Sequence, residues 1–357
     1  MTIAITTTTT TTITTTITNN MKQYFFFAFI LLNSSSFAQK GLKAIRLKET
    51  ERIETILAAD DMQGRKAFTA GNEKAAAFIA DEFEKIGLQK WNNGESYLQT
   101  FTMVKKINAN KRTIFTFDLA QEGEQVKLSN VVGILPGKSK PNEYVIFSGH
   151  FDHIGISTRN MQNNDSIFNG ANDDAAGTTA MIMLAKYFKK LNNNERTLVF
   201  AAFNAEEVGG FGATYFSKQF DPAQVIAMFN IEMIGTESKW GKNSAYITGF
   251  DKTNMGEILQ KNLTGTSFVF HPDPYPDQQL FYRSDNATLA MLGVPAHTIS
   301  TSKMDNEPNY HKASDEIATL DLKNMNEIIK AIALSSRGIV AGTETPSRVD
   351  TSALKRR

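Results

Sequence analysis

Two apolar runs most constrain the fold of this chain. Residues 144–147 read Tyr-Val-Ile-Phe, and the seven residues from Thr197 to Phe203 carry no charged side chain. Runs of this kind are typical of strands buried on both faces of a sheet. Each run leads into polar residues, first His150 and then Glu206 and Glu207. Because ligands of an open α/β sheet bind at the carboxyl ends of its strands, residues far apart in sequence are expected to converge there.

Strands and helices alternate along most of the chain. Further strands are expected at 97–104, 113–117, 126–135, 225–231, 245–248, 268–270 and 296–300, and helices at 41–59, 69–88, 178–191, 212–219, 254–263, 287–292 and 322–340. This alternation predicts an α/β fold, a three-layer α/β/α sandwich with a mixed, mostly parallel central sheet. The pattern shows no repeat and no linker, so we expect one domain from 41 to 342, followed by a disordered tail at 343–357.

Composition limits the chemistry that the chain can perform. The 357 residues include no cysteine, which excludes disulfides, thiol catalysis and thiolate metal sites. Any bound metal must therefore be held by His, Asp and Glu, a donor set that suits zinc, manganese or cobalt. The formal net charge of +1 gives no reason to expect nucleic acid as a partner.

The N-terminus has the pattern of an exported protein. Residues 1–20 are a low-complexity, threonine-rich leader, which we interpret as an upstream start that is not used in the cell. Residues 21–38 combine a positive start, an apolar run from Tyr24 to Leu32 and a Ser-Phe-Ala end, which predicts a signal peptide cleaved after Ala38. The alternative, a membrane anchor, is disfavoured because the run is short for a bilayer. We expect a periplasmic or secreted protein without a stable membrane anchor.

Carboxylates and imidazoles stand where successive elements end. A site for two metal ions needs about five such ligands, one of them bridging ions roughly 3.5–4 Å apart. The candidates are His150, Asp173, Glu207, Glu232 and His311. Glu206, beside Glu207, adds a second carboxylate, so one of the two can bind a metal while the other accepts a proton from an attacking water. Asp152 is expected to accept a hydrogen bond from the His150 imidazole and fix its tautomer.

These residues lie in motifs of a known family. The sequences at 149–152, 172–177, 206–207, 230–235 and 310–315 read GHFD, NDDAAG, EE, NIEMIG and YHKASD. In this order they resemble the co-catalytic zinc aminopeptidases of metallopeptidase family twenty-eight, whose relatives include glutamate carboxypeptidase and glutaminyl cyclase. The likeness covers roughly 45–340 and implies the zinc exopeptidase fold and two zinc ions per chain.

The resemblance also implies a role for each site residue. His150 and Glu232 correspond to ligands of one zinc, Glu207 to a ligand of the other, and His311 to the last ligand of the set. Asp173 corresponds to the bridging ligand and is followed in the family by a cis peptide, here to Asp174. Glu206 resembles the general base that acts on a water bridging the two ions. A tyrosine hydroxyl stabilises the oxyanion in this family, and Tyr310 is preferred here over Tyr282 because it precedes His311.

Some positions depart from the family pattern or fit more than one role. Glu232 is the longer of the two acids found at its position, and Asn286 stands where relatives commonly carry His. Asp174 fits equally well as a site residue or as a helix N-terminal acid. Of the remaining histidines and acids, His153 is expected to line the cleft, His271 and His297 to be ordinary loop and strand residues, and Asp315 to orient His311 or cap a helix.

The expected function is that of a metallo-aminopeptidase that removes N-terminal residues from peptides as a monomer. Carboxypeptidase or dipeptidase action on the same site stays open. A single-zinc glutaminyl cyclase is a second class, which the NDDAAG motif and the acid at Glu232 argue against. A non-catalytic binding protein is a third class, which the complete ligand set argues against.

Overall fold

The described residues contain the strands that the sequence predicts, with shifts at their ends. Those of the main sheet are β1 (Gln89–Lys90), β2 (Leu98–Ile107), β3 (Thr113–Thr116), β4 (Glu124–Leu135), β5 (Lys140–His150), β8 (Arg196–Phe203), β9 (Val225–Ile231), β10 (Ser244–Ile247), β11 (Val269–Pro272) and β12 (Ala296–Ser300). The short strands β6 (Gly155–Ile156) and β7 (Ile167–Phe168) pair with each other. This computed structural model describes residues 42–158, 161 and 164–354. The predicted leader (1–20) and signal peptide (21–38) lie outside the described residues.

The main sheet is mixed, with a parallel centre. Its ten strands run in the order β11-β10-β12-β9-β5-β8-β4-β2-β3, and β1 pairs with β4. The four central strands β12, β9, β5 and β8 are parallel to one another. Strands β4, β2 and β3 continue the sheet in antiparallel fashion. Every residue of β8 is buried, as its apolar run indicates.

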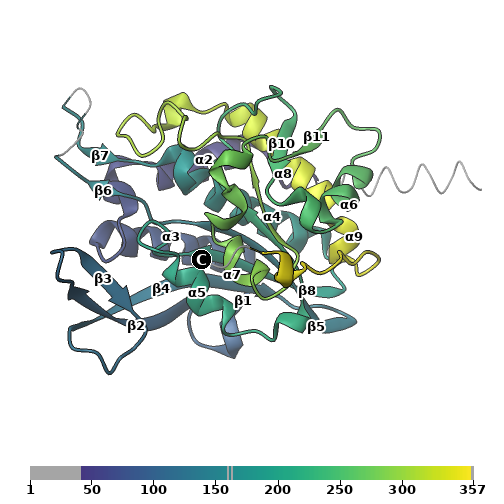
Figure 1. The fold of residues 1–357 in the computed structure, drawn as a ribbon. Helices are drawn as coiled ribbons and strands as arrows, with labels where there is room; N and C mark the ends of the chain where they lie inside the picture. Colours follow the sequence, from purple (N-terminus) through teal and green to yellow (C-terminus); the bar gives the residue numbers. More distant parts are fainter. Residues whose placement is uncertain (1–41, 159–160, 162–163, 355–357) are drawn as a thin grey trace, which may run out of the picture. The chain divides into compact units, whose positions relative to one another are not determined.

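Helices cover both faces of this sheet (Figure 1). One layer contains α2 (Leu47–Leu57), α3 (Ala70–Ile86), α4 (Ala176–Leu191), α6 (Met255–Asn262) and α8 (Leu322–Ser335). The opposite face is covered by α5 (Phe211–Ser217) and α7 (Asn286–Ala290), which pack on apolar side chains of the central strands. The predicted three-layer α/β/α arrangement is therefore confirmed.

The helix ends differ from the prediction at two places. The helix predicted at 41–59 is shorter, because α2 begins at Leu47 and ends at Leu57. The last one is interrupted at Ser336, where the side-chain hydroxyl donates a hydrogen bond to the Ile332 carbonyl, and continues as α9 (Arg337–Val340). Within the described part of the chain, no helix is long and apolar enough to cross a membrane.

The prediction of a disordered tail at 343–357 is wrong for its described part, 343–354. Val349 and Leu354 are only 5% and 7% exposed and join the apolar cluster on the α5 and α7 face. The guanidinium of Arg348 donates a 2.7 Å hydrogen bond to the Val225 carbonyl. Two apolar side chains in a polar segment give no periodic signal, so their burial could not be read from the sequence.

Candidate metal centre

Three neighbouring strands deliver side chains to one edge of the sheet. His150 is the last residue of β5, Glu232 directly follows β9, and Glu206 and Glu207 follow β8 after a two-residue link. Because β9, β5 and β8 are adjacent and parallel, their carboxyl ends meet. The residues Ala205 and Met233, next to Glu206 and Glu232, have φ of 63° and 52°. Such left-handed backbone at a non-glycine residue is typical of functional sites.

The turn before α4 brings Asp173 to the same edge. The peptide between Asp173 and Asp174 is cis, as the resemblance implies. A Cβ at Gly177 would lie 2.0 Å from the Ile231 carbonyl oxygen, so only glycine allows α4 to begin this close to β9. The carboxylate of Asp174 accepts hydrogen bonds from the amides of His150 (3.2 Å) and Met233 (3.1 Å). Asp174 thus ties this turn to the ends of β5 and β9.

One group of potential ligands consists of His150, Asp173 and Glu232, whose ligand atoms lie within 4.8 Å of one another. Nε2 of His150 is 3.3 Å from Oδ1 of Asp173. Nε2 of His150 and Oε2 of Glu232 are buried and have no hydrogen-bond partner among the described residues. Buried polar atoms normally have partners, so these orphaned atoms point to a cation between them.

A second group of potential ligands consists of Asp173, Glu207 and His311, and it shares Asp173 with the first group. Nε2 of His311 is 3.2 Å from Oδ2 of Asp173 and 3.2 Å from Oε2 of Glu207. Asp173 therefore presents one oxygen to each group, the arrangement that a bridging ligand requires. The structure brings together all five predicted ligand residues. Their nitrogen and oxygen donors fit zinc and related divalent ions.

His153 also belongs to this second group, although the sequence interpretation only placed it along the cleft. It is 1% exposed, and its ligand atom lies within 4.8 Å of those of Asp173 and Glu207. Nδ1 of His153 is 2.9 Å from Oε1 of Glu207. The only signal in the sequence was a second imidazole three residues after His150.

The structure corrects the contact expected for Asp152. Nδ1 of His150 lies 3.1 Å from the main-chain oxygen of Asp152 and 3.8 Å from its carboxylate. A carbonyl can only accept, so Nδ1 carries the proton and Nε2 is left free to bind a metal. The Asp152 carboxylate instead accepts hydrogen bonds from the amides of Glu206 and Glu207. Burial raises the pKa of Asp152 to about 6.

Asp315 holds Asp173 and not His311. Its carboxylate accepts hydrogen bonds from the amides of Asn172 (2.9 Å) and Asp173 (3.0 Å). These amides lie in the turn that leads into α4, so Asp315 caps that turn. The expectation that Asp315 orients His311 is replaced by a link between the loop of His311 and the turn of Asp173.

Glu206 and Tyr310 lie beside the two ligand groups. Burial raises the pKa of Glu206 well above its ordinary value; the nearby His150 opposes this rise, and Asp285 and Glu232 add to it. The ring of Tyr310 stacks on His311 at 3.9 Å, and burial raises the pKa of its hydroxyl. Tyr282 instead packs against Phe281, which favours Tyr310 as the hydroxyl of the site.

The sequence interpretation missed Arg65, which binds main-chain segments next to the ligand residues. This arginine is fully buried, and its guanidinium donates hydrogen bonds of 2.6–2.9 Å to the main-chain oxygens of Leu57, Phe151, Asn169 and Gly170. Phe151 follows the ligand His150, and Gly170 begins the turn that carries Asp173. A lone arginine in a predicted loop gives no sequence signal of such a role.

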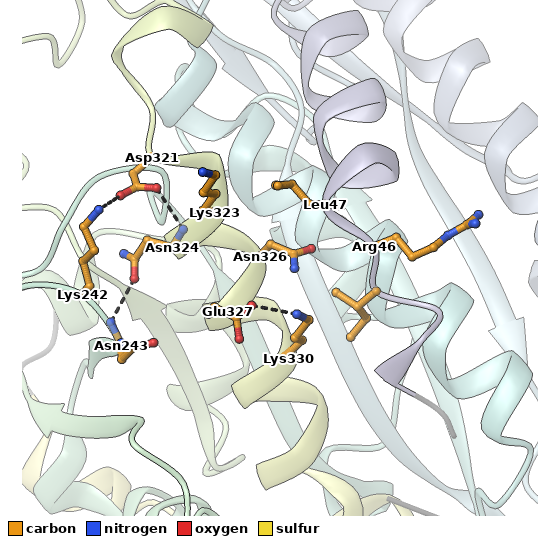
Figure 2. Close-up of a pocket in the computed structure, with 11 residues that line it drawn as sticks. Arg46, Leu47, Lys242, Asn243, Asp321, Lys323, Asn324, Asn326, Glu327 and Lys330 are labelled. Carbon is orange, nitrogen blue, oxygen red and sulfur yellow. Dashed lines mark hydrogen bonds and ion pairs between the residues drawn. The ribbon is translucent and has the colours of Figure 1, made fainter. Parts of the chain in front are cut away.

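A surface pocket of about 650 Å³ lies elsewhere, between the start of α2 and α8. Figure 2 shows the ion pairs Lys242–Asp321 and Lys330–Glu327 on its wall. The pocket contains none of the ligand residues described above. It is therefore separate from the candidate metal centre.

Comparisons with known proteins identify zinc metalloproteases and aminopeptidases as similar to this chain. A probable zinc metalloprotease of Pyrenophora teres f. teres (strain 0-1) is 30% identical over 158 residues, which are 44% of this chain and 29% of that protein. Aminopeptidase YwaD of Bacillus subtilis (strain 168) is 28% identical over 173 residues, or 46% and 31%. These matches span about a third of the length of those curated relatives.

A solved structure and a family model complete the comparison. The aminopeptidase from Aneurinibacillus sp. strain AM-1 superposes with a TM-score of 0.63 over 90% of this chain and 98% of its own. At 14% identity this likeness shows the shared fold. Residues 130–335 match the model of peptidase family M28, and they include every predicted ligand. The chain therefore belongs to peptidase family M28.

Proposed function

We propose that the protein is a zinc-dependent aminopeptidase that removes N-terminal residues from peptides. The observation that carries this proposal is the position of Asp173 between two groups of ligands. Its Oδ1 faces His150, in the group completed by Glu232, and its Oδ2 faces His311, in the group completed by Glu207. His150, Asp173 and Glu232 would hold one ion, and Asp173, Glu207 and His311 the other.

The bound ions would polarise the carbonyl of the scissile bond and lower the pKa of the attacking water. Glu206 then accepts a proton from this water and delivers it to the leaving amine. The Tyr310 hydroxyl donates a hydrogen bond to the carbonyl oxygen as negative charge develops there. Asp152 holds the main chain of Glu206 and Glu207 in place through its two hydrogen bonds.

The comparison with a named aminopeptidase supports an aminopeptidase over a carboxypeptidase. We further propose that the protein acts in the periplasm or outside the cell, on the basis of the predicted signal peptide.

Metal content and activity test the proposal together. Protein comprising residues 39–357 should contain about two zinc ions per chain and cleave aminoacyl-anilides. A chelator should abolish cleavage, and zinc should restore it. Cyclisation of a glutaminyl peptide with one zinc ion per chain would instead assign the protein to the cyclase class, and zinc binding without either activity would indicate a binding protein.

Glu206→Gln tests the proposed base because it keeps the size of the side chain and removes its ability to take a proton. We expect zinc content to be retained and turnover to fall by roughly 10²–10⁴-fold. Glu327→Gln, on the far wall of the surface pocket, is a matched control that should keep normal turnover. Near-normal rates in Glu206→Gln would remove Glu206 from the mechanism.

A further inference from the structure

We propose that His153 is a positioning residue for Glu207, holding its carboxylate so that the second oxygen faces the metal. This inference rests on the two-metal function proposed above. The two oxygens of Glu207 have different neighbours: Oε1 is 2.9 Å from Nδ1 of His153, and Oε2 is 3.2 Å from Nε2 of His311. One oxygen of the Glu207 carboxylate is therefore bound to His153, and the other faces His311.

The distances distinguish a hydrogen bond from shared metal binding. Two ligand atoms that share a tetrahedral zinc at about 2.0–2.1 Å lie about 3.3 Å apart. Three pairs fit this separation: His150 with Asp173 at 3.3 Å, and His311 with Asp173 and with Glu207 at 3.2 Å. Nδ1 of His153 does not, at 2.9 Å from Glu207 and 3.8 Å from Asp173. The shorter distance is typical of an N–H···O hydrogen bond.

The proton on His153 must lie on Nδ1. A carboxylate oxygen only accepts hydrogen bonds, so the contact with Glu207 requires an Nδ1–H donor. Nε2 of His153 is buried and has no hydrogen-bond partner among the described residues. A proton there would be a buried, unpaired donor, which is costly, so the tautomer with its proton on Nδ1 is favoured.

The surroundings hold this imidazole in one position. The amide of His153 donates a 3.3 Å hydrogen bond to the Arg65 carbonyl, and its main chain forms a bridge with Lys66. The imidazole ring packs directly on Gly170, because a Cβ at position 170 would lie 2.5 Å from Cδ2 of His153. The main chain of His153 is held by Arg65 and Lys66, and its ring is held by packing on Gly170. The hydrogen bond from the imidazole can therefore orient Glu207 before a metal binds.

Two variants separate positioning from direct metal binding. His153→Asn keeps an N–H donor near the position of Nδ1 but has no imidazole, whereas His153→Ala removes both. His271→Ala is a control, since His271 stacks on Trp240 and belongs to neither ligand group. Zinc affinities of the two positions would be measured by competition with a chelator, and cobalt-substituted protein would report its ligands by visible absorption.

We expect His153→Ala to weaken the second zinc by roughly 10–100-fold while the first stays unchanged, as is typical when the partner of a metal ligand is removed. His153→Asn should bind both ions within about threefold of the wild type, with an unaltered cobalt spectrum. Unchanged affinity in His153→Ala would overturn the inference. Equal loss of the second ion in both variants, with an altered cobalt spectrum, would overturn it in favour of direct binding.

The same titration keeps this inference distinct from the proposed function. A wild-type chain that binds a single ion refutes the two-metal proposal and the inference with it. A wild-type chain that binds two ions, as does His153→Ala with equal affinity, refutes only the role of His153. The affinity of the first position and the circular dichroism spectrum show whether each variant is folded.

Discussion

The carboxylate of Asp152 accepts a hydrogen bond from the main-chain amide of Glu206, at 3.0 Å from its Oδ1. Its Oδ2 accepts a second bond from the amide of Glu207 at 3.3 Å. The main-chain oxygen of Asp152 faces Nδ1 of His150. One residue thereby sets the position of the proposed base and of a proposed ligand on each side of the centre.

Asp152→Asn should therefore lower turnover by roughly 10–100-fold, as changes next to metal ligands do. The asparagine amide nitrogen must face one of the two N–H groups, so one hydrogen bond is lost and Glu206 or Glu207 shifts. Binding of zinc by the His150 group should persist, because the main-chain oxygen is unchanged. Steady-state kinetics and zinc content check this, with Asp118→Asn in the exposed β3–β4 loop as control. Wild-type turnover in Asp152→Asn would contradict the positioning role.

Arg65→Lys should destabilise the protein by roughly 2–4 kcal/mol, because a buried ammonium group cannot replace the fork of the guanidinium. Arg65 donates hydrogen bonds to four main-chain oxygens. The donors of a lysine all lie on one nitrogen atom, so they cannot reach all four. The urea midpoint and slope give the free energy of unfolding. Arg52→Lys is the matched control, since its ion pairs with Glu49 and Glu82 are partly exposed and should contribute under about 1 kcal/mol. Equal stabilities of the two variants would contradict the prediction.

The ligands could be predicted because each stands at a recognisable boundary. His150 and Glu207 follow apolar runs that are typical of buried strands, and the parallel order of these strands places their ends together. The motif around Asp173 added the bridging position. These are local patterns, which can be recognised in a sequence without its structure.

The supporting residues could not be predicted because their partners are main-chain atoms far away in sequence. Arg65 contacts Gly170 across 105 positions, and Asp315 contacts Asp173 across 142. Neither contact requires a particular side chain at the partner position. The residue type at that position therefore does not indicate the contact. His153 was underestimated for a different reason: its contact with the side chain of Glu207 depends on how the loop after β5 turns.

Truncation after Gly342 should destabilise the domain by roughly 3–6 kcal/mol. It removes the buried side chains of Val349 and Leu354, each contributing roughly 1.5–3 kcal/mol. It also removes the Glu344 carbonyl and the Thr345 hydroxyl, to which the buried Arg196 donates hydrogen bonds. Chemical denaturation of the truncated chain measures the loss, and removal of residues 355–357 alone serves as control. An unchanged midpoint after truncation at Gly342 would show that 343–354 adds no stability.

His297 provides a test of stability against pH away from the metal ligands. Burial lowers its pKa from 6.5 to about 4, although its hydrogen bond to the Thr248 carbonyl opposes the shift. Between pH 6.5 and 4 the unfolded chain therefore binds a proton at this residue and the folded chain does not. Stability from this group is present above pH 6.5 and is lost as the pH falls towards 4, by about 3 kcal/mol in total.

His297→Gln removes this titration and retains a polar side chain that can pair with Thr253, the other partner of His297. Carboxylates and metal ligands also titrate in this range, so the informative quantity is the difference in unfolding free energy between wild type and variant. Measured on metal-free protein, the advantage of the wild type should shrink by about 3 kcal/mol between pH 7 and pH 4. Parallel stability curves would mean that His297 binds its proton equally well in the folded and unfolded chain, and that burial in the β12 strand does not control it.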